Sequence, residues 1–242
     1  VGFDYAFGWE TVGGFQRTFE EQGGQVIQKI WTPLNTTDFS PFIAQIKPDA
    51  DAVFAVFFGR GSLQFVKQYA ESGLKAKIPL IGNGTLTDES VLPQMGDEAL
   101  GVYTALHYSA ALDNPANKKY AKAFEAKAGK IPSYYAETCY TNMRWIVEAI
   151  KAINGKVEDR EAFLAALKKV ELKDFPRGPV VIDKWGNPVQ NIYVRKVERV
   201  GGQLQNAVIF TYPAVSQFWK YNPDEFLKQP LYTRDYPPCK HC

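Results

Sequence analysis

The strongest constraint on the fold is an alternation of short apolar runs with amphipathic stretches through the first 107 residues. Five runs are predicted to be strands, at residues 1–3, 25–31, 52–58, 78–81 and 101–107. Four intervening stretches have helical spacing, at residues 8–22, 39–46, 62–72 and 89–95. This βαβ alternation predicts an α/β fold with a mostly parallel sheet that helices cover on both faces.

The turns after these strands are where a ligand is expected, because ligands of such sheets bind beyond the carboxyl ends of the strands. The turns are rich in glycine, aromatic and hydroxyl residues. The candidate ligand contacts in them are Tyr5, Phe7, Phe58, Arg60, Gly61, Asn83, Gly84 and Thr85. Arg60 could pair with a carboxylate, or it could be a solvated surface arginine. The backbone N–H groups after Phe58 could likewise face a carboxylate, or the glycines there could simply form a tight turn.

Composition excludes several classes of partner. The net charge is +2 over 242 residues, with acids and bases interspersed, which argues against a nucleic-acid surface or a polybasic membrane patch. No apolar run approaches the roughly 18 residues needed to span a bilayer. The hydrophobic share of 45% is ample for one large domain or two lobes.

The second half of the chain changes character. Helices are predicted at residues 114–129, 136–153 and 159–170, followed by strands at 180–183, 191–200 and 205–212. Gly201-Gly202 is predicted to form a hairpin between the last two strands, and residues 213–242 to form a surface-wrapping tail. These helices need a further sheet to cover. Because that sheet is not encoded here and Val1 opens inside a strand, we expect further sequence before Val1.

The residues that catalysis or cofactor binding would need are scarce. The only histidines are His107 and His241, and neither has a serine in a G-x-S-x-G context nearby. Residues 59–61 match the first two glycines of a dinucleotide fingerprint, but Gln64 takes the place of the third. No H-E-x-x-H motif or EF-hand loop occurs. We therefore expect neither an enzyme nor a cofactor.

The three cysteines carry separate expectations. Cys139 falls within a helical pattern and is predicted to be a small buried apolar group. Cys239 and Cys242 form a C-x-x-C pair at the end of the chain. Such a pair suits a tail disulfide or idle thiols, with half a metal site as the alternative.

Seven stretches in a fixed order carry a resemblance to a known family. They are Asp-Tyr-Ala-Phe-Gly-Trp-Glu (4–10), Thr-Thr-Asp-Phe-Ser-Pro-Phe (36–42), Ala-Asp-Ala-Val-Phe (50–54), Phe-Val-Lys-Gln-Tyr-Ala-Glu-Ser-Gly-Leu (65–74), Ala-Leu-His-Tyr-Ser (105–109), Pro-Ser-Tyr-Tyr-Ala-Glu (132–137) and Asn-Pro-Val-Gln-Asn-Ile-Tyr (187–193). In this order and spacing the chain resembles the leucine/isoleucine/valine-binding protein family, the type I periplasmic substrate-binding proteins of ABC importers. The resemblance runs from Val1 to about Pro238.

The resemblance implies two Rossmann-like lobes joined by a hinge, with the ligand in the cleft between them. Residues 1–107 would be the second-lobe α/β unit, and residues 108–178 helices returning to the first lobe. Residues 179–242 would be hinge-crossing strands and a C-terminal tail. The opening part of the first lobe would precede Val1.

The resemblance also assigns site residues by position. Phe7 corresponds to an aromatic residue that packs on the ligand, and the turn at 58–62 to a second loop lining the cleft. Tyr135, or its neighbour Tyr134, corresponds to an aromatic that closes the cleft from the first lobe.

One departure from the family bears on the ligand. Amino-acid binders of this family place an acid in the turn after the fourth strand to hold the ligand ammonium. Residues 82–85 read Gly-Asn-Gly-Thr and contain no carboxylate, and burying an ammonium without a counter-charge is costly. We therefore expect a small carboxylate-bearing solute, for which an amine-free, aromatic acid fits better than a branched-chain amino acid.

The resemblance implies how such a protein works. A periplasmic monomer would close its lobes on the ligand and hand it to the membrane permease of an ABC importer, with no nucleic-acid partner. The alternative is a ligand-sensing domain of the same fold that feeds a receptor or regulator. An enzyme of doubly wound fold is a third and weaker reading.

Overall fold

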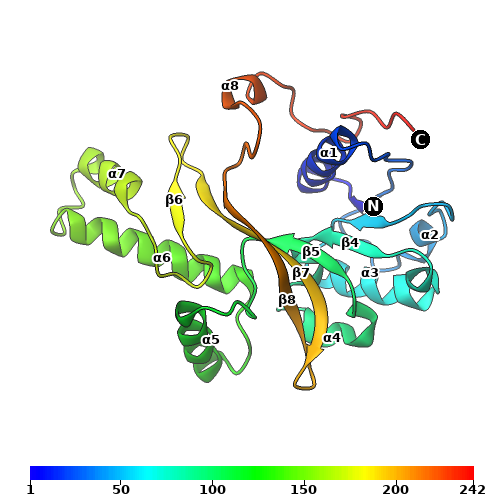
Figure 1. Ribbon diagram of the computed structural model, residues 1–242, viewed down its shortest axis with the longest axis horizontal. Coiled ribbons are helices and arrows are strands. Elements are labelled where there is room, and N and C mark those ends of the chain that lie inside the picture. The colour runs from blue at the N-terminus through cyan, green and yellow to red at the C-terminus, as the bar shows by residue number, and fades with distance from the viewer. The chain divides into compact units, whose positions relative to one another are not determined.

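The computed structural model describes residues 1–242 and divides them into two compact units. Unit 1 comprises residues 1–105, 196–205 and 228–242, and unit 2 comprises residues 106–195 and 206–227. The long strands β7 (Pro188–Val200) and β8 (Gln203–Val215) each contribute residues to both units (Figure 1). Each unit has its own hydrophobic core. None of the helices combines the length and apolar character that crossing a bilayer requires.

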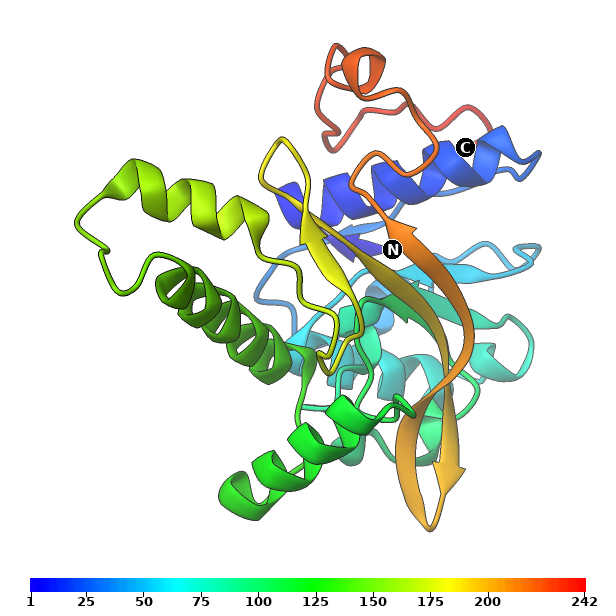
Figure 2. The same ribbon diagram turned by 60° about the vertical axis from the view of Figure 1, so that its left-hand side comes forward.

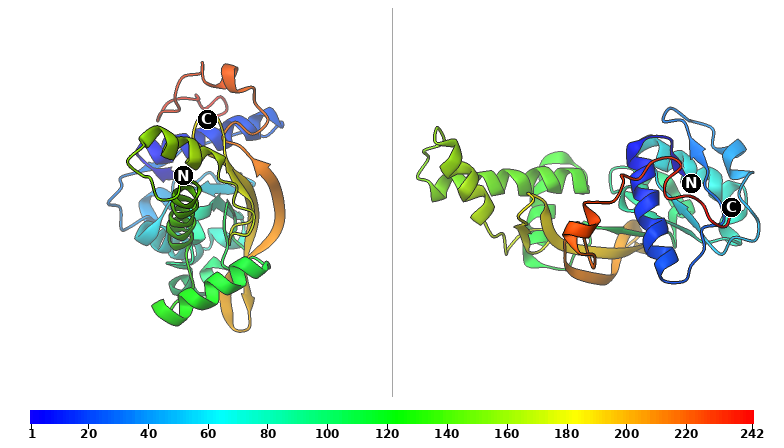
Figure 3. Two further views of the ribbon diagram at one scale, coloured as in Figure 1. Left: turned by 90° about the vertical axis from the view of Figure 1, so that its left-hand side faces the viewer. Right: turned by 90° about the horizontal axis from the view of Figure 1, so that it is seen from above.

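Unit 1 alternates strands and helices as the sequence predicts. Its elements are β1 (Gly2–Phe3), α1 (Ala6–Glu21), β2 (Trp31–Thr32), α2 (Ser40–Ile43), β3 (Val53–Ala55), α3 (Gly59–Glu71), η1 (Leu74–Ala76), β4 (Leu80–Asn83), η2 (Gly84–Thr87), α4 (Leu92–Met95), η3 (Gly96–Ala99) and β5 (Tyr103–Leu106), whose last residue belongs to unit 2. The C-terminal segment, residues 228–242, returns to this unit and crosses α1 (Figure 3).

The sheet of unit 1 is parallel, as predicted. β1 pairs with β2, and Gly2 also forms a parallel bridge with Val56 just after β3. β3, β4 and β5 follow in parallel order, and β7 lies next to β5. Helix α1 covers one face of this sheet and α3 the other (Figures 1 and 2). The core between sheet and helices is aromatic and aliphatic, with Phe57 and Phe65 fully buried and their rings 4.5 Å apart.

Several elements of unit 1 differ in extent from the sequence prediction, including β3 and α2, which are both shorter than predicted. The second strand is confined to Trp31–Thr32, since its partner β1 offers only two residues for pairing. The fourth helix is confined to Leu92–Met95, where Pro93 suits a first turn. Helix α3 begins at Gly59, three residues earlier than predicted, and Gly59 itself has a φ of +56°, which a glycine accepts readily.

Unit 2 holds the three helices predicted for the second half. Its elements are α5 (Pro115–Ala128), α6 (Tyr134–Ala152), α7 (Arg160–Lys169), β6 (Val180–Ile182), α8 (Pro223–Phe226) and the unit 2 parts of β7 and β8. Side chains of Asn114, Ser133 and Asp159 cap α5, α6 and α7. β6 runs antiparallel to β7, and α6 packs beside α7 (Figure 2). At the far end of β7, in unit 1, the predicted hairpin at Gly201-Gly202 is confirmed, with both φ angles positive.

The prediction for Cys139 is wrong: its thiol is exposed on α6. The helix buries Glu137, Thr141, Trp145 and Ala149, which recur every four residues along one face. Cys139 stands two residues from Glu137, about 200° around the helix, and so points away from that face. Cys239 and Cys242 form a disulfide, one of the alternatives that the sequence left open.

Candidate functional site

Three turns of unit 1 lie at the carboxyl ends of its parallel strands, where ligands of such sheets bind. They connect β1 to α1, β3 to α3 and β4 to η2. The residue before each helical segment is Tyr5, Phe58 or Asn83, each with an extended backbone. The three turns therefore present their candidate residues at the start of a helix rather than in a long loop.

The fold brings three of the predicted aromatic residues together. The ring of Phe7 lies 6.0 Å from Tyr5 and 5.8 Å from Phe58, and Tyr5 lies 6.4 Å from Phe58. All three side chains are half-buried. Phe58 in turn packs on Phe3, which is buried, with the two ring centroids 5.3 Å apart. The cluster of Tyr5, Phe7 and Phe58, called the aromatic cluster below, is a half-open apolar surface of a kind that suits a flat ligand.

Two helices begin beside the aromatic cluster without a capping side chain. The residues that precede α1 and α3, Tyr5 and Phe58, make no side-chain capping hydrogen bond to the N–H groups of the first turn. These amide groups, together with the positive end of each helix dipole, favour an anion. Arg60, in the first turn of α3, is exposed and adds a positive charge there. The geometry suits a carboxylate at the edge of an aromatic surface.

Glycine allows the two helix starts to approach the sheet closely. A Cβ on Gly8 would stand 2.0 Å from the carbonyl oxygen of Phe3, and one on Gly61 would stand 2.4 Å from the ring of Phe3. Only glycine fits at either position without movement of backbone or core. The predicted site residue Gly61 therefore shapes the site by the absence of a side chain.

The third turn is tied together internally. Thr85 is buried, and its hydroxyl donates to the carbonyl of Phe57 at 2.6 Å. The side-chain Nδ2 of Asn83 donates to Oγ1 of Thr85 at 2.6 Å. The side-chain Oδ1 of Asn83 is buried without a hydrogen-bond partner. Gly84 begins the short helix η2. Of the three predicted residues here, Asn83 retains an acceptor and Thr85 serves chiefly to join the second and third turns.

Unit 2 carries a second aromatic group, built on the start of α6. Tyr134 and Tyr135 are the first two residues of this helix, and their rings lie 4.0 Å apart. Tyr135 is 46% exposed, and Tyr134 meets the edge of the His107 ring at 5.8 Å. The helix begins two residues earlier than the sequence predicts because Ser133 caps it, with its hydroxyl accepting from the N–H of Ala136.

A buried ion pair supports this second aromatic group. Glu137 is fully buried, and both its carboxylate oxygens accept from Nε of Arg177, at 3.0 and 2.8 Å. Arg177 also donates to Gln190 at 2.9 Å and to Thr138 at 2.7 Å. The pair anchors the first turn of α6, immediately after Tyr134 and Tyr135. Sequence reasoning missed it because the two residues are 40 positions apart and no local pattern joins them.

His107 lies beside this ion pair, and its imidazole is neutral near pH 7. Its Nε2 lies 3.3 Å from the Thr138 hydroxyl, which also accepts from Arg177. Burial, followed by the positive charges of Arg177 and Arg195, lowers the pKa of His107 from 6.5 to about 3. A histidine held neutral in this way suits a packing and hydrogen-bonding role better than acid–base chemistry near neutral pH.

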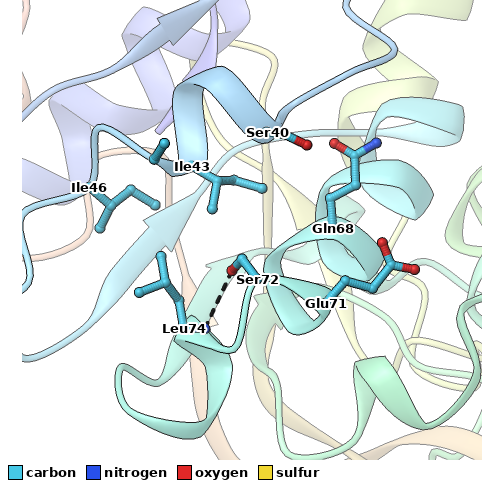
Figure 4. A pocket seen from close by; sticks show the side chains of 8 residues that line it. Ser40, Ile43, Ile46, Gln68, Glu71, Ser72 and Leu74 are labelled. Carbon is cyan, nitrogen blue, oxygen red and sulfur yellow. Dashed lines mark hydrogen bonds between the residues drawn. The ribbon is translucent and has the colours of Figure 1, made fainter.

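A groove in unit 1 lies away from these turns. It has a volume of about 520 Å³ and lies between α2 and the C-terminal half of α3 (Figure 4). Ile43, Ile46 and Leu74 form its apolar side, and Gln68 and Glu71 its polar side. None of the predicted site residues lines it.

Known proteins resemble the chain over most of its length. Residues 1–203 match the model of the family described as "Periplasmic binding protein". A Leu/Ile/Val-binding protein homolog 6 from Brucella melitensis is 38% identical over 216 residues, which cover 86% of this chain and 55% of that protein. The chain thus spans about half the length of this relative.

Solved structures show the same relationship. A solute-binding protein of an ABC transporter from Rhodopseudomonas palustris BisB5, in complex with 3,4-dihydroxybenzoic acid, is 38% identical with a TM-score of 0.83. One from R. palustris in complex with benzoate is 34% identical with a TM-score of 0.82. The matches cover 88% and 90% of this chain, and 59% of each of those chains. A leucine-binding protein from Thermotoga maritima, 22% identical with a TM-score of 0.71, shares the fold.

Proposed function

Since the chain belongs to the periplasmic binding protein family, in its leucine/isoleucine/valine-binding branch, we propose that the protein is the substrate-binding component of an ABC importer. It works in the periplasm as a monomer, binds a small aromatic carboxylate that lacks an amino group, and delivers it to a membrane permease. No covalent chemistry is part of this function.

The aromatic cluster beside two uncapped helix starts carries the proposal. Tyr5, Phe7 and Phe58 offer ring faces to a benzoate-like ligand, and the first turns of α1 and α3 offer N–H groups to its carboxylate. Arg60 supplements that charge from the start of α3. Tyr134 and Tyr135, whose rings lie 4.0 Å apart, are proposed as ligand-binding residues as well.

The choice of ligand class follows from charge. An amino acid carries an ammonium as well as a carboxylate, and an ammonium in a closed site needs a counter-charge. The third turn, Asn83-Gly84-Thr85, supplies a buried amide oxygen but no carboxylate. The R. palustris relatives with bound benzoate and 3,4-dihydroxybenzoic acid support the same choice.

Calorimetry on the protein in its full natural length tests the proposal. Benzoate and 4-hydroxybenzoate are expected to bind, and leucine and phenylalanine to bind far more weakly. Phe7→Ala is expected to weaken benzoate binding about 10- to 100-fold, which corresponds to about 1.4–2.8 kcal/mol for the lost ring contact.

Phe19→Ala provides the matched control. Phe19 lies on the same helix but is 42% exposed and stacks on Phe15 rather than on the aromatic cluster. This variant should leave the affinity for benzoate unchanged. Tight binding of leucine, together with no detectable binding of benzoate, would refute the proposed ligand class.

A further inference from the structure

The C-terminal segment, residues 228–242, is docked along α1 rather than trailing from it (Figure 3). Side chains of α1 and of the stretch before β2 contact it through polar groups. These contacts are Arg17 to the Gln229 side chain, Gln16 to the Pro238 carbonyl and Lys29 to the Pro237 carbonyl. The segment lies beyond residue 203, where the family match ends.

The ring of Tyr232 in this segment packs against α1 at a glycine. Gly13 is buried, and a Cβ at this position would stand 2.5 Å from the ring of Tyr232. Tyr232 therefore packs directly against the helix backbone. This contact sets the position of the residues that follow it, including Arg234.

Arg234 reaches the first turn of the proposed ligand site. Its Nε lies 3.2 Å from Oδ1 of Asp4. The same oxygen accepts from the indole N–H of Trp9 at 3.0 Å. The backbone N–H of Asp4 in turn donates to the carbonyl of Thr32 at 2.7 Å, and the next residue is Tyr5 of the aromatic cluster.

Asp4 is poorly suited to a site for an anion. Its carboxylate stands at the start of α1, where it would compete with a ligand carboxylate for the positive end of the helix and repel it. Arg234 supplies the opposite charge from outside the family-matched part of the chain. Because Trp9 and Arg234 contact the same oxygen, they also hold the Asp4 side chain in one orientation.

We propose that Arg234 is a positioning residue of the ligand site, which orients and neutralises Asp4 so that the first turn accepts an anionic ligand. This inference rests on the proposed function, since it assumes an aromatic carboxylate at that turn. Through Arg234, the C-terminal segment would therefore contribute to the affinity for the ligand.

Variants of the full-length protein test the inference through the dissociation constant for benzoate. Arg234→Ala is expected to weaken binding about two- to fivefold, because an ion pair as exposed as this one contributes little. Arg234→Lys should recover part of the loss. Combining Asp4→Asn with Arg234→Ala should restore the affinity, because asparagine keeps an acceptor for Trp9 and removes the charge.

Lys240→Ala is the matched control. Lys240 lies in the same segment and pairs with Glu20 at 3.8 Å, on the far part of α1 from Asp4. Its loss should leave the dissociation constant within twofold. An unchanged affinity in Arg234→Ala would overturn the inference. So would a double variant as weak as Arg234→Ala, which would show that the segment acts through docking rather than through the charge of Asp4.

A measurement without ligand separates the inference from the proposed function. The Trp9 indole N–H resonance should shift in Arg234→Ala and remain in place in Lys240→Ala. If the wild-type protein binds no aromatic acid but this resonance shifts, the ligand class is refuted and the positioning of Asp4 by Arg234 is supported. If the resonance does not move, Arg234 does not position Asp4, whatever the ligand.

Discussion

Replacing Arg177 with methionine is expected to destabilise the protein more than the replacement of an exposed arginine in unit 2. The guanidinium holds Glu137, which is fully buried, and donates further hydrogen bonds to Gln190 and Thr138. Methionine fills a similar volume but has no hydrogen-bond donor and no charge. The Glu137 carboxylate would then keep one side-chain donor, the hydroxyl of Thr141.

The magnitude follows from the burial of both partners. Removing one member of a buried ion pair leaves an uncompensated charge and costs about 3–5 kcal/mol. Against a typical unfolding free energy of about 5–15 kcal/mol, this is about a fifth or more of the total stability. Replacing Glu137 and Arg177 together with methionine should recover most of the loss, since an apolar pair of similar volume carries no desolvation cost.

Urea unfolding followed by circular dichroism measures these differences, with Arg160→Met as the control. Arg160 is exposed on α7, so its replacement should change stability by about 0.5 kcal/mol at most. The double variant of Glu137 and Arg177 provides a second readout. This variant, in which the buried carboxylate is absent, should be more stable than Arg177→Met.

Two results would refute this reasoning. One is a deficit below about 1 kcal/mol for Arg177→Met, which would show that Glu137 does not depend on its partner. The other is a double variant no more stable than Arg177→Met, which would show that the loss is one of packing and not of charge.

Two further predictions concern the framework of the site. Gly61→Ala places a Cβ 2.4 Å from the buried ring of Phe3 and should cost about 1–3 kcal/mol in urea unfolding and weaken benzoate binding; Gly14→Ala, where a Cβ meets nothing within 4 Å, should instead stabilise α1 by about 0.5–1 kcal/mol. The pKa of His107 is about 3 in the native protein and 6.5 ordinarily. As the pH falls, the unfolded chain therefore binds a proton at this residue before the native protein does. Stability should therefore fall as the pH drops from 6.5 toward 3, by about 1.4 kcal/mol per pH unit at most. The curve for His107→Asn should lack that component, and identical slopes for the two proteins would contradict the assignment.

Much of the fold could be read from local patterns. Strands and helices of unit 1 follow from apolar runs of period two and amphipathic stretches of period 3.6, so their order is visible in the sequence. The placement of Tyr5, Phe7 and Phe58 at turns follows from the same patterns. Their meeting follows from the rule that parallel strands share one carboxyl edge. These predictions needed only residues close together in the chain and the general geometry of parallel sheets.

The sequence by itself thus determined the alternation of elements in unit 1 and the edge of its sheet at which the candidate residues stand. Only the tertiary structure decided the pairing of Glu137 with Arg177, the exposure of Cys139 and the docking of Arg234 on Asp4. The physical reason is separation along the chain. A hydrogen bond or ion pair between residues 40 or 230 positions apart depends on how many elements pack at once, whereas periodicity reports only on the element in which a residue lies.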